Sequence, residues 1–270
     1  MKAADKLKKR NNKKLHICVG LDPDENKIPS FLKSSNSAIL DFNTAIVNET
    51  SSYVAAYKLN FAFYECLGSK GLDIILETIK IIPDDILIIA DAKRGDIGNS
   101  SKKYAASIFE YFKCDAVTLN PYMGEDSISP FLEYKDKLNF ILALTSNPGG
   151  NDFEKLKLDK GNFLFQEVIS KVKQWSENNN CGIVFGATKL DELTENIISF
   201  DALPVLLPGI GAQGGDLNSV VQTFLQNNRR NFLINTSRSV IYKSSGSAFA
   251  KAAKEEVLRM NNLISALYTN

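Results

Sequence analysis

Residues 86–96 read Ile-Leu-Ile-Ile-Ala-Asp-Ala-Lys-Arg-Gly-Asp, an apolar run that ends in a series of charged side chains. A run of five apolar residues is typical of a parallel strand that is buried on both faces. The charges begin at Asp91, where such a strand would leave the sheet. Asp91 and Lys93 are two residues apart, so on a strand their side chains lie on the same side. This stretch therefore predicts a buried parallel strand with a charged site at its carboxyl end.

Similar apolar runs recur along the chain and alternate with amphipathic segments of helical length. The expected strands are Leu15–Leu21, Tyr53–Asn60, Ile86–Asp91, Cys114–Leu119, Asn139–Thr145, Cys181–Gly186, Pro204–Leu207 and Asn231–Thr236. The expected helices include Ser37–Ser51, Ser69–Ile81, Asn99–Phe112, Asn162–Ser176, Leu217–Gln226 and Ser247–Leu267. Strands that are each followed by helical sequence predict an α/β fold, a (β/α)₈ TIM barrel in which residues 1–270 form a single domain. A doubly wound open sheet is the alternative.

The composition fits a globular protein. A length of 270 residues with 44% hydrophobic content suits a barrel, and a formal charge of +1 argues against a general nucleic-acid binder. The four cysteines are far apart, which predicts buried free thiols in a reducing cytoplasm rather than a disulfide framework or a zinc site.

The basic start of the chain, Lys2 to Lys14, lacks the apolar core of a signal peptide, and no apolar run is long enough to span a bilayer. We therefore expect a cytoplasmic protein without membrane contact. Residues 1–10 predict a short amphipathic helix that precedes the barrel, with its lysines on a solvated face.

Two sequence features suggest a metal or dinucleotide site, but their context argues against both. His16 is the single histidine and lies inside the first expected strand, which predicts a packed or hydrogen-bonded side chain rather than a metal ligand. Gly209-Ile210-Gly211-Ala212-Gln213-Gly214 matches the G-x-G-x-x-G dinucleotide fingerprint. It follows the seventh strand, however, and residues 217–254 contain no Asp or Glu to bind a ribose, so a nicotinamide site is not expected.

The same glycine loop suits a phosphate. Glycines let backbone N–H groups approach an anion closely, and in barrels the loops after strands seven and eight often bind phosphate. Arg238 follows the eighth expected strand and supplies a permanent cation at that place. A plain glycine-rich turn with a surface arginine is the alternative.

Charged residues also gather at the ends of the first three expected strands: Asp22, Lys58, Asp91 and Lys93. Buried charges are costly unless they are paired, so a structural ion network is one interpretation. Four such residues at one rim favour an active site.

Taken together, these residues resemble the orotidine monophosphate decarboxylase family along nearly the whole chain. The resemblance rests on Asp22, Lys58, Asp91/Lys93/Asp96, Ser146-Asn147-Pro148-Gly149 and Pro208-Gly209-x-Gly-Ala-Gln213. Residues 57–64 and the added length are similar to the longer subgroup of that family. Ser100 stands where threonine is common and Asn147 where histidine is frequent. Neither difference removes a needed hydroxyl or charge.

The resemblance implies decarboxylation of orotidine 5′-phosphate (OMP) to uridine 5′-phosphate (UMP) in pyrimidine biosynthesis, without cofactor or metal. Lys93 would protonate the ring carbon that loses CO₂. Catalytic roles are implied for Lys93, Asp91, Lys58 and Asp96, and substrate binding for Asp22, Asn60, Ser100, Ser146, Pro208, Gly209, Gln213, Gly214 and Arg238. Asp96 and Ser100 would reach the partner subunit's site, so a homodimer with a shared active site is implied. We also expect the loops 147–157 and 209–216 to close over the substrate.

Two other functions stay open at this point. A magnesium-dependent sugar-phosphate decarboxylase or aldolase of the same superfamily resembles this chain in D-x-K-x-x-D, but such relatives place a metal-binding glutamate where Lys58 stands here. A non-catalytic pyrimidine-nucleotide-binding protein is the second, and the presence of Asp91, Lys93 and Asp96 together argues against it.

Overall fold

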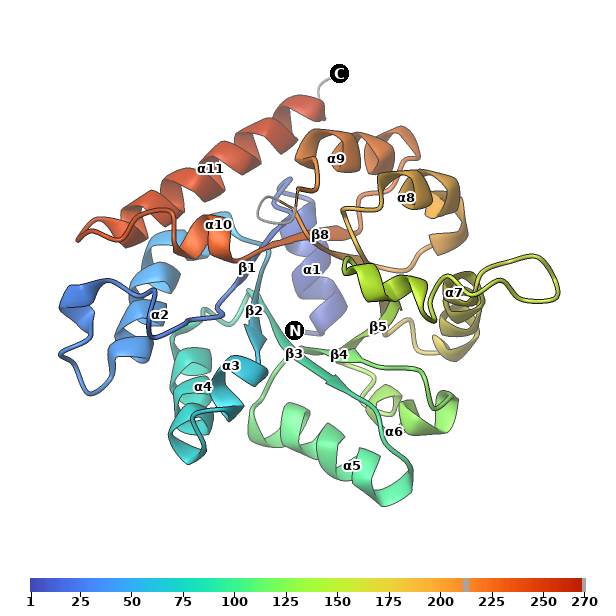
Figure 1. The fold of residues 1–270 in the computed structure, drawn as a ribbon, viewed down its shortest axis with the longest axis horizontal. Helices are drawn as coiled ribbons and strands as arrows, with labels where there is room; N and C mark the ends of the chain where they lie inside the picture. Colours follow the sequence, from blue (N-terminus) through green and yellow to red (C-terminus); the bar gives the residue numbers. More distant parts are fainter. Residues whose placement is uncertain (211–213, 269–270) are drawn as a thin grey trace.

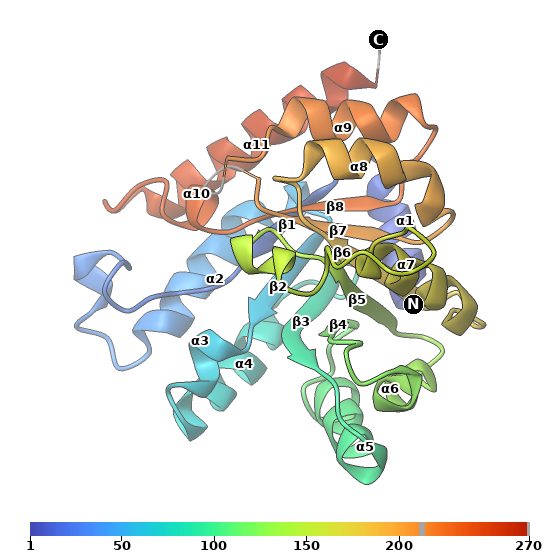
Figure 2. The ribbon, with the colours of Figure 1, turned by 45° about the vertical axis from the view of Figure 1, so that its right-hand side comes forward.

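The computed structural model describes residues 1–210 and 214–268, and these form a closed barrel. The strands β1 to β8 follow one another around it, all neighbouring pairs are parallel, and β8 pairs with β1. Helices surround the strands (Figure 1), and a turned view shows the same arrangement (Figure 2). The predicted (β/α)₈ barrel is confirmed, and the open sheet is wrong.

Each expected strand is present, with small changes at its ends. The strands are β1 (Ile17–Gly20), β2 (Ala56–Asn60), β3 (Leu87–Arg94), β4 (Ala116–Leu119), β5 (Leu138–Leu144), β6 (Cys181–Phe185), β7 (Val205–Pro208) and β8 (Phe232–Thr236). The most informative difference is in β3, which we expected to end at Asp91. It continues through the charged residues to Arg94.

The helices also follow the expected pattern. They are α1 (Ala3–Asn11), α2 (Ala38–Thr50), α3 (Ala62–Glu65), α4 (Ser69–Ile81), α5 (Gly98–Ala106), α6 (Ser129–Leu132), α7 (Leu164–Trp175), α8 (Leu190–Asn196), α9 (Leu217–Gln226), α10 (Arg238–Ile241) and α11 (Phe249–Leu267). The bounds of α4 and α9 agree with the prediction. Asp216 explains the start of α9, because its carboxylate accepts hydrogen bonds from the N–H groups of Asn218 and Ser219.

The barrel interior is apolar along most of its length and polar at one end. One buried cluster includes alternate strand residues: Cys18, Ala56, Leu87, Ile89, Ala116, Leu138, Phe140, Val184, Leu206 and Leu233. Because side chains alternate along a strand, the residue two positions further on faces the same interior. Those residues are Lys58 on β2, Asp91 on β3, Thr118 on β4 and Asn235 on β8. The carboxyl ends of the strands therefore form a polar mouth above an apolar core.

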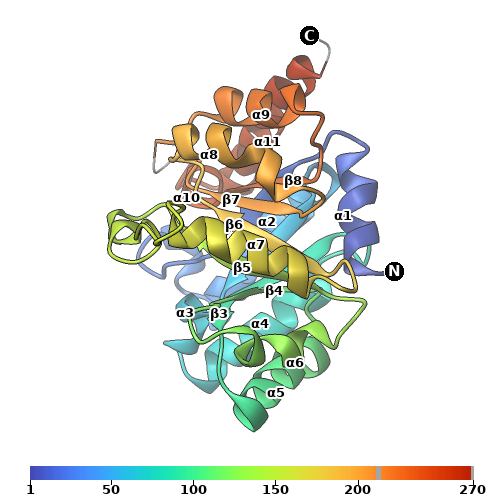
Figure 3. The ribbon, with the colours of Figure 1, turned by 90° about the vertical axis from the view of Figure 1, so that its right-hand side faces the viewer.

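Helix α1 covers the opposite end of the barrel (Figure 3), where Ala3 and Leu7 join the interior cluster. Our prediction that its lysines are solvated is wrong for Lys6, which is buried, and Arg10 is buried as well. Lys6 Nζ lies 2.8 Å from Asp115, and Arg10 binds Asp85 at 2.9 Å. Burial of the apolar face of α1 brings these cations against carboxylates that offset their desolvation.

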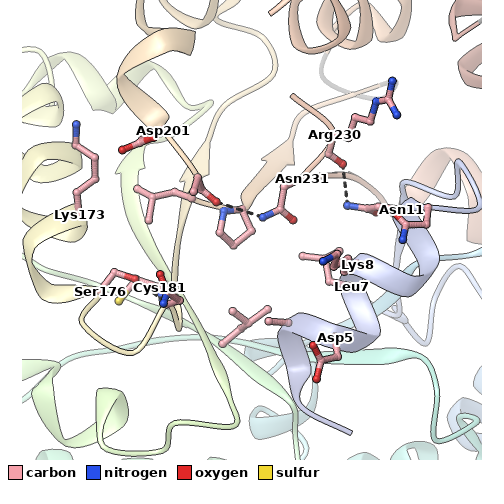
Figure 4. Close-up of a pocket in the computed structure, with 17 residues that line it drawn as sticks. Asp5, Leu7, Lys8, Asn11, Lys173, Ser176, Cys181, Asp201, Arg230 and Asn231 are labelled. Atoms are coloured by element: carbon pink, nitrogen blue, oxygen red, sulfur yellow. Dashed lines mark hydrogen bonds between the residues drawn. The ribbon is translucent and has the colours of Figure 1, made fainter. Parts of the chain in front are cut away.

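Between α1 and the loops that lead into β6, β7 and β8 lies a cavity of about 540 Å³ (Figure 4). Asn11 of α1 donates to the Arg230 carbonyl at 2.9 Å on one side of it. The charges around this cavity are mixed, and Lys173 and Arg230 lie on opposite sides of it in Figure 4. No set of like charges converges there among the described residues, so we do not place the active site at this end.

The four cysteines are free, and three of them, Cys18, Cys114 and Cys181, are buried as predicted. The prediction is wrong for Cys66, which is exposed. It follows the short helix α3, and its thiol donates to the Phe63 carbonyl at 3.5 Å. Among the described residues, no helix is both long enough and apolar enough to cross a bilayer.

His16 is buried directly before β1, which confirms the prediction of a packed histidine. Its Nδ1 lies 3.1 Å from the Phe232 carbonyl and its Nε2 lies 2.6 Å from the Tyr268 hydroxyl. Since a carbonyl can only accept, Nδ1 carries the proton and Nε2 accepts from the tyrosine. Burial lowers the pKa of His16 to about 4, although the Phe232 carbonyl acts in the opposite direction. The imidazole is therefore neutral in the folded protein at neutral pH.

This burial predicts a dependence of stability on pH. The folded-state pKa lies below the unfolded value of 6.5, so the unfolded chain binds the proton first as the pH falls. The contribution of neutral His16 is complete above about pH 6.5 and decreases as the pH falls toward 4, by up to about 3 kcal/mol. Urea unfolding of wild type and of His16→Gln, from about pH 7.5 to about pH 4.5, measures this contribution to the free energy of unfolding. The variant should be less sensitive to pH, and equal slopes would contradict the effect.

Candidate active site

The polar mouth of the barrel brings together four charged residues from three neighbouring strands. The pairing aligns Gly20 of β1 with Lys58 of β2, and Asn60 of β2 with Asp91 of β3. Asp22 follows β1, two residues beyond Gly20, and accepts a hydrogen bond from the N–H of Asn60 at 3.2 Å. Parallel register therefore places side chains that are far apart in the sequence at one point of the rim.

Ion pairs connect these four residues in a row. Lys58 Nζ donates to Asp91 Oδ2 at 2.8 Å and lies 3.8 Å from Asp22 Oδ1. Lys93 Nζ donates to the other oxygen of the same carboxylate, Asp91 Oδ1, at 2.6 Å. The lysine side chains differ in exposure: that of Lys58 is 5% exposed and that of Lys93 is 50% exposed. Lys58 is thus a buried member of the network, and Lys93 presents its ammonium group to the open mouth.

The electrostatics of this cluster favour the charged forms of Asp91 and Lys58. Burial alone would raise the pKa of Asp91, but the ammonium groups of Lys58 and Lys93 outweigh it and hold the pKa well below its ordinary value. Burial alone would lower the pKa of Lys58, but the carboxylates of Asp22 and Asp91 outweigh it and raise the pKa. Below them, burial raises the pKa of the Cys18 thiol to about 12, so it is neutral. Asp91 and Lys58 are therefore both charged at neutral pH.

A cavity of about 310 Å³ lies at the same rim, beside the cluster. Its lining includes Asp22, Pro208, Gly209, Asn235, Arg238 and Tyr242. Gly209 directly follows β7 with φ 104°, a conformation that side chains with a Cβ rarely adopt. Arg238 begins α10, with one residue between it and the end of β8, and is exposed. The loops after β7 and β8 therefore meet at one cavity, as expected for a phosphate site.

The remaining predicted binding residues lie in different places. Ser146 follows β5 and Asn60 is the last residue of β2, so both lie at the same rim, and both are partly exposed. Gly214 has φ 87°, in the left-handed region, as a glycine turn requires. Gln213 lies outside the described residues, so its predicted contact with phosphate stays a prediction.

Asp96 and Ser100 do not join the cluster within one chain. They line a separate open depression on the outer side of α5, together with Asn99 and Tyr104. The carboxylate of Asp96 accepts from the N–H of Ile97 at 2.8 Å, so the turn after β3 holds it in place. Within one chain these two residues therefore do not contact the cluster, and their predicted role in a partner's site stays a prediction.

Sequence reasoning did not select two polar residues of the mouth. Thr118 on β4 is buried and donates to Asp91 Oδ1 at 3.0 Å. Asn235 on β8 lines the cavity, and its side-chain oxygen is buried without a hydrogen-bond partner. Both stand two residues beyond an interior apolar residue on their strands. The two-residue alternation of side chains along a strand could therefore have identified them from the sequence.

None of the described residues forms a group of three or more His, Cys, Asp and Glu side chains that could hold a metal ion. Between the two carboxylates Asp22 and Asp91, the position is taken by Lys58 Nζ. The ammonium group of Lys58, which pairs with these oxygens, would repel Mg²⁺ from them.

Fold and site together define the class: a (β/α)₈ barrel with a charged site at the carboxyl ends of its strands, beside a cavity suited to phosphate. Comparison with known proteins identifies the family within this class. The model of the orotidine 5′-phosphate decarboxylase / HUMPS family matches residues 15–253. The chain belongs to this family.

Individual relatives agree over nearly the full length. Orotidine 5′-phosphate decarboxylase of Dehalococcoides mccartyi (strain CBDB1) is 45% identical over 269 residues, which cover 98% of each protein. The protein of the same name from Herpetosiphon aurantiacus is 48% identical over 240 residues, or 88% of each. The solved structure of Leishmania donovani OMP decarboxylase has a TM-score of 0.84 and 32% identity, and the match covers 98% of this chain and 99% of that one.

Proposed function

We propose that the chain decarboxylates OMP to UMP and CO₂ in pyrimidine biosynthesis, without a cofactor, and that residues 1–270 act as one catalytic domain. The observation that carries the proposal is the row Lys58–Asp91–Lys93, with both lysines on one carboxylate, next to the cavity that Arg238 lines. The names of the relatives support the substrate and the reaction.

In the proposed reaction, Lys93 supplies the proton. The bond between the ring carbon and the carboxylate breaks, CO₂ leaves, and the electron pair stays on that carbon. The ammonium group of Lys93 stabilises this developing charge and then transfers a proton to it, and water later restores the proton on the lysine. The half-exposed ammonium group at the mouth suits this role, because it can reach a substrate while the carboxylate of Asp91 holds it in place.

Asp91 has a second role in the proposal. A substrate carboxylate placed beside this ionised side chain is repelled, and the repulsion disappears as CO₂ departs. Binding of the remote phosphate supplies part of the free energy that holds the substrate in this pose. Arg238, Gln213 and the backbone of Pro208, Gly209 and Gly214 would bind the phosphate. Asp22, Asn60 and Lys58 would bind the ribose, and Ser146 would contact the pyrimidine.

The proposal includes a homodimer in which Asp96 and Ser100 complete the partner's site. Large apolar side chains are exposed on the loops after β3 and β4, the first of which carries Asp96. Ile97 is 62% exposed, Tyr122 is 76% exposed and Met123 is 49% exposed. Large apolar residues exposed on one face mark protein contacts, so this surface is suited to a second copy of the chain. Free cysteines support the proposed cytoplasmic location.

The two alternatives lack such support. A magnesium-dependent sugar-phosphate enzyme would need carboxylates free to bind the metal, and Lys58 already pairs with Asp22 and Asp91. A nucleotide-binding protein without activity would not need Lys93 to present an ammonium group beside a buried carboxylate.

The test is incubation of the purified chain with OMP, followed by chromatography of the nucleotides. We expect stoichiometric conversion of OMP to UMP with release of CO₂. A folded protein that binds UMP but never consumes OMP would support the non-catalytic alternative and overturn the proposal. Consumption of a hexulose 6-phosphate with Mg²⁺, but not of OMP, would support the sugar-phosphate enzyme.

Arg238→Ala should lower kcat/KM for OMP by roughly 10- to 100-fold, mainly through a higher KM, because a charge-assisted contact with the phosphate is lost. Arg230→Ala is the matched control, since Arg230 precedes β8 at the opposite end of the barrel and is also exposed. Steady-state kinetics of both variants measure the difference. Equal effects of the two substitutions would contradict a phosphate site at Arg238.

A further inference from the structure

The end of β3 that carries Lys93 departs from regular parallel pairing. β3 pairs with β4 at Ala90 and Val117, and the pairing resumes at Arg94 and Leu119. Residues 91–93 of β3 therefore face one residue of β4, Thr118, in a bulge. Lys93 has φ 47°, in the left-handed region that a residue with a Cβ adopts only where its surroundings hold it. Such a conformation needs a local support.

The hydroxyl of Thr118 provides that support. Its Oγ1 accepts a hydrogen bond from the backbone N–H of Lys93 at 3.0 Å and donates one to Asp91 Oδ1 at 3.0 Å. The direction of both bonds is forced, because an amide N–H only donates and an ionised carboxylate only accepts. Thr118 is 2% exposed, so water does not replace these bonds easily.

These bonds close a ring. Lys93 Nζ donates to the same oxygen, Asp91 Oδ1, that receives the threonine hydroxyl. Thr118 thus contacts both the backbone of Lys93 and the carboxylate that binds its ammonium group. Lys58 holds the other carboxylate oxygen. The direction in which Lys93 presents its ammonium group depends on this ring.

We propose that Thr118 is a positioning residue for the decarboxylation, whose hydroxyl holds Lys93 and Asp91 in the arrangement required for proton transfer. This role rests on the proposed function and deepens it. The β-branched side chain restricts its own χ1, which keeps the hydroxyl in place. Valine has nearly the same shape without the hydroxyl, and serine keeps the hydroxyl without the branch.

Thr118→Val should lower kcat for OMP by roughly 10- to 100-fold, since a hydrogen bond to a charged group and the alignment of the proton donor are lost. The affinity for UMP should stay within about threefold, because the cavity beside Arg238 is unchanged. Thr118→Ser should recover kcat to within about fivefold of wild type. Thr78→Val is the matched control: Thr78 is equally buried, and its hydroxyl accepts from Asn43 between α4 and α2 at 3.0 Å. Its kcat should not change.

The measurements are steady-state kinetics with OMP, UMP binding by calorimetry and thermal melting followed by circular dichroism. If the valine variant does not fold, Thr118→Ala replaces it in the same comparison. The positioning role would be overturned if the folded valine variant had a kcat within about threefold of the wild-type value. A serine variant as slow as the valine variant, or a loss of UMP binding in proportion to kcat, would also overturn it. A wild-type chain that does not turn over OMP contradicts the proposed function itself, and this role with it.

Discussion

Lys93→Ala is expected to lower kcat for OMP by at least about 10⁴-fold, while UMP binds within about tenfold of the wild-type affinity. The substitution removes the proposed proton donor and the positive charge that would face the developing charge on the ring. The proposed phosphate site at the other side of the mouth stays in place. Removal of the ammonium group also leaves Asp91 with Lys58 and Thr118 as its partners, so the buried carboxylate is still compensated.

Steady-state kinetics and calorimetry with UMP measure the two halves of this prediction. Lys80→Ala is a suitable control, because Lys80 is an exposed lysine of α4 that pairs with Glu77 on the same helix. A Lys93→Ala protein that keeps more than roughly a hundredth of the wild-type kcat would refute the role of Lys93 as proton donor.

Heterodimers of Lys93→Ala and Asp96→Ala subunits are expected to have about half of the wild-type activity, although each homodimer is nearly inactive. If each site combines Lys93 of one subunit with Asp96 of its partner, one site of the heterodimer carries both substitutions and the other carries neither. In a single chain, Asp96 lines a depression separate from the cluster, which is the reason for this expectation.

The heterodimer is obtained by co-expression of two differently tagged subunits and sequential affinity purification. Its activity per dimer is then compared with wild type and with both homodimers. A heterodimer as inactive as the homodimers contradicts a shared site, because each site would then hold its own defective residue. A monomeric wild-type chain in light scattering would contradict it as well.

The fold was accessible from the sequence because the strands are buried on both faces. Near-continuous apolar runs located each strand, and the two-residue period placed Asp91 and Lys93 on one side. The last residues of β3 were harder to predict, because the bulge opposite Thr118 depends on hydrogen bonds from β4. No pattern within residues 86–96 shows that a neighbouring strand will supply a hydroxyl.

The charged residues of the candidate site were predictable from the sequence, but the contacts that hold them in place were not. Asp22, Lys58, Asp91 and Lys93 stand out as charges at strand ends, and the structure brings them together. The buried ion pair between Lys6 and Asp115 could not be predicted, since these residues are far apart in the sequence. The sequence pattern around Lys6 does not distinguish a buried lysine from a solvated one. Side-chain pairing between distant elements is decided by packing, which a single sequence does not display.

The most direct test of the central claim is the initial rate of OMP decarboxylation by purified protein before and after dialysis against EDTA. The loss of OMP absorbance in the ultraviolet follows the reaction. If the cluster of Asp22, Lys58, Asp91 and Lys93 performs the chemistry with its own charges, the two rates are equal and added Mg²⁺ changes neither. A rate that disappears with EDTA and returns with Mg²⁺ would contradict the account and assign the chemistry to a metal ion.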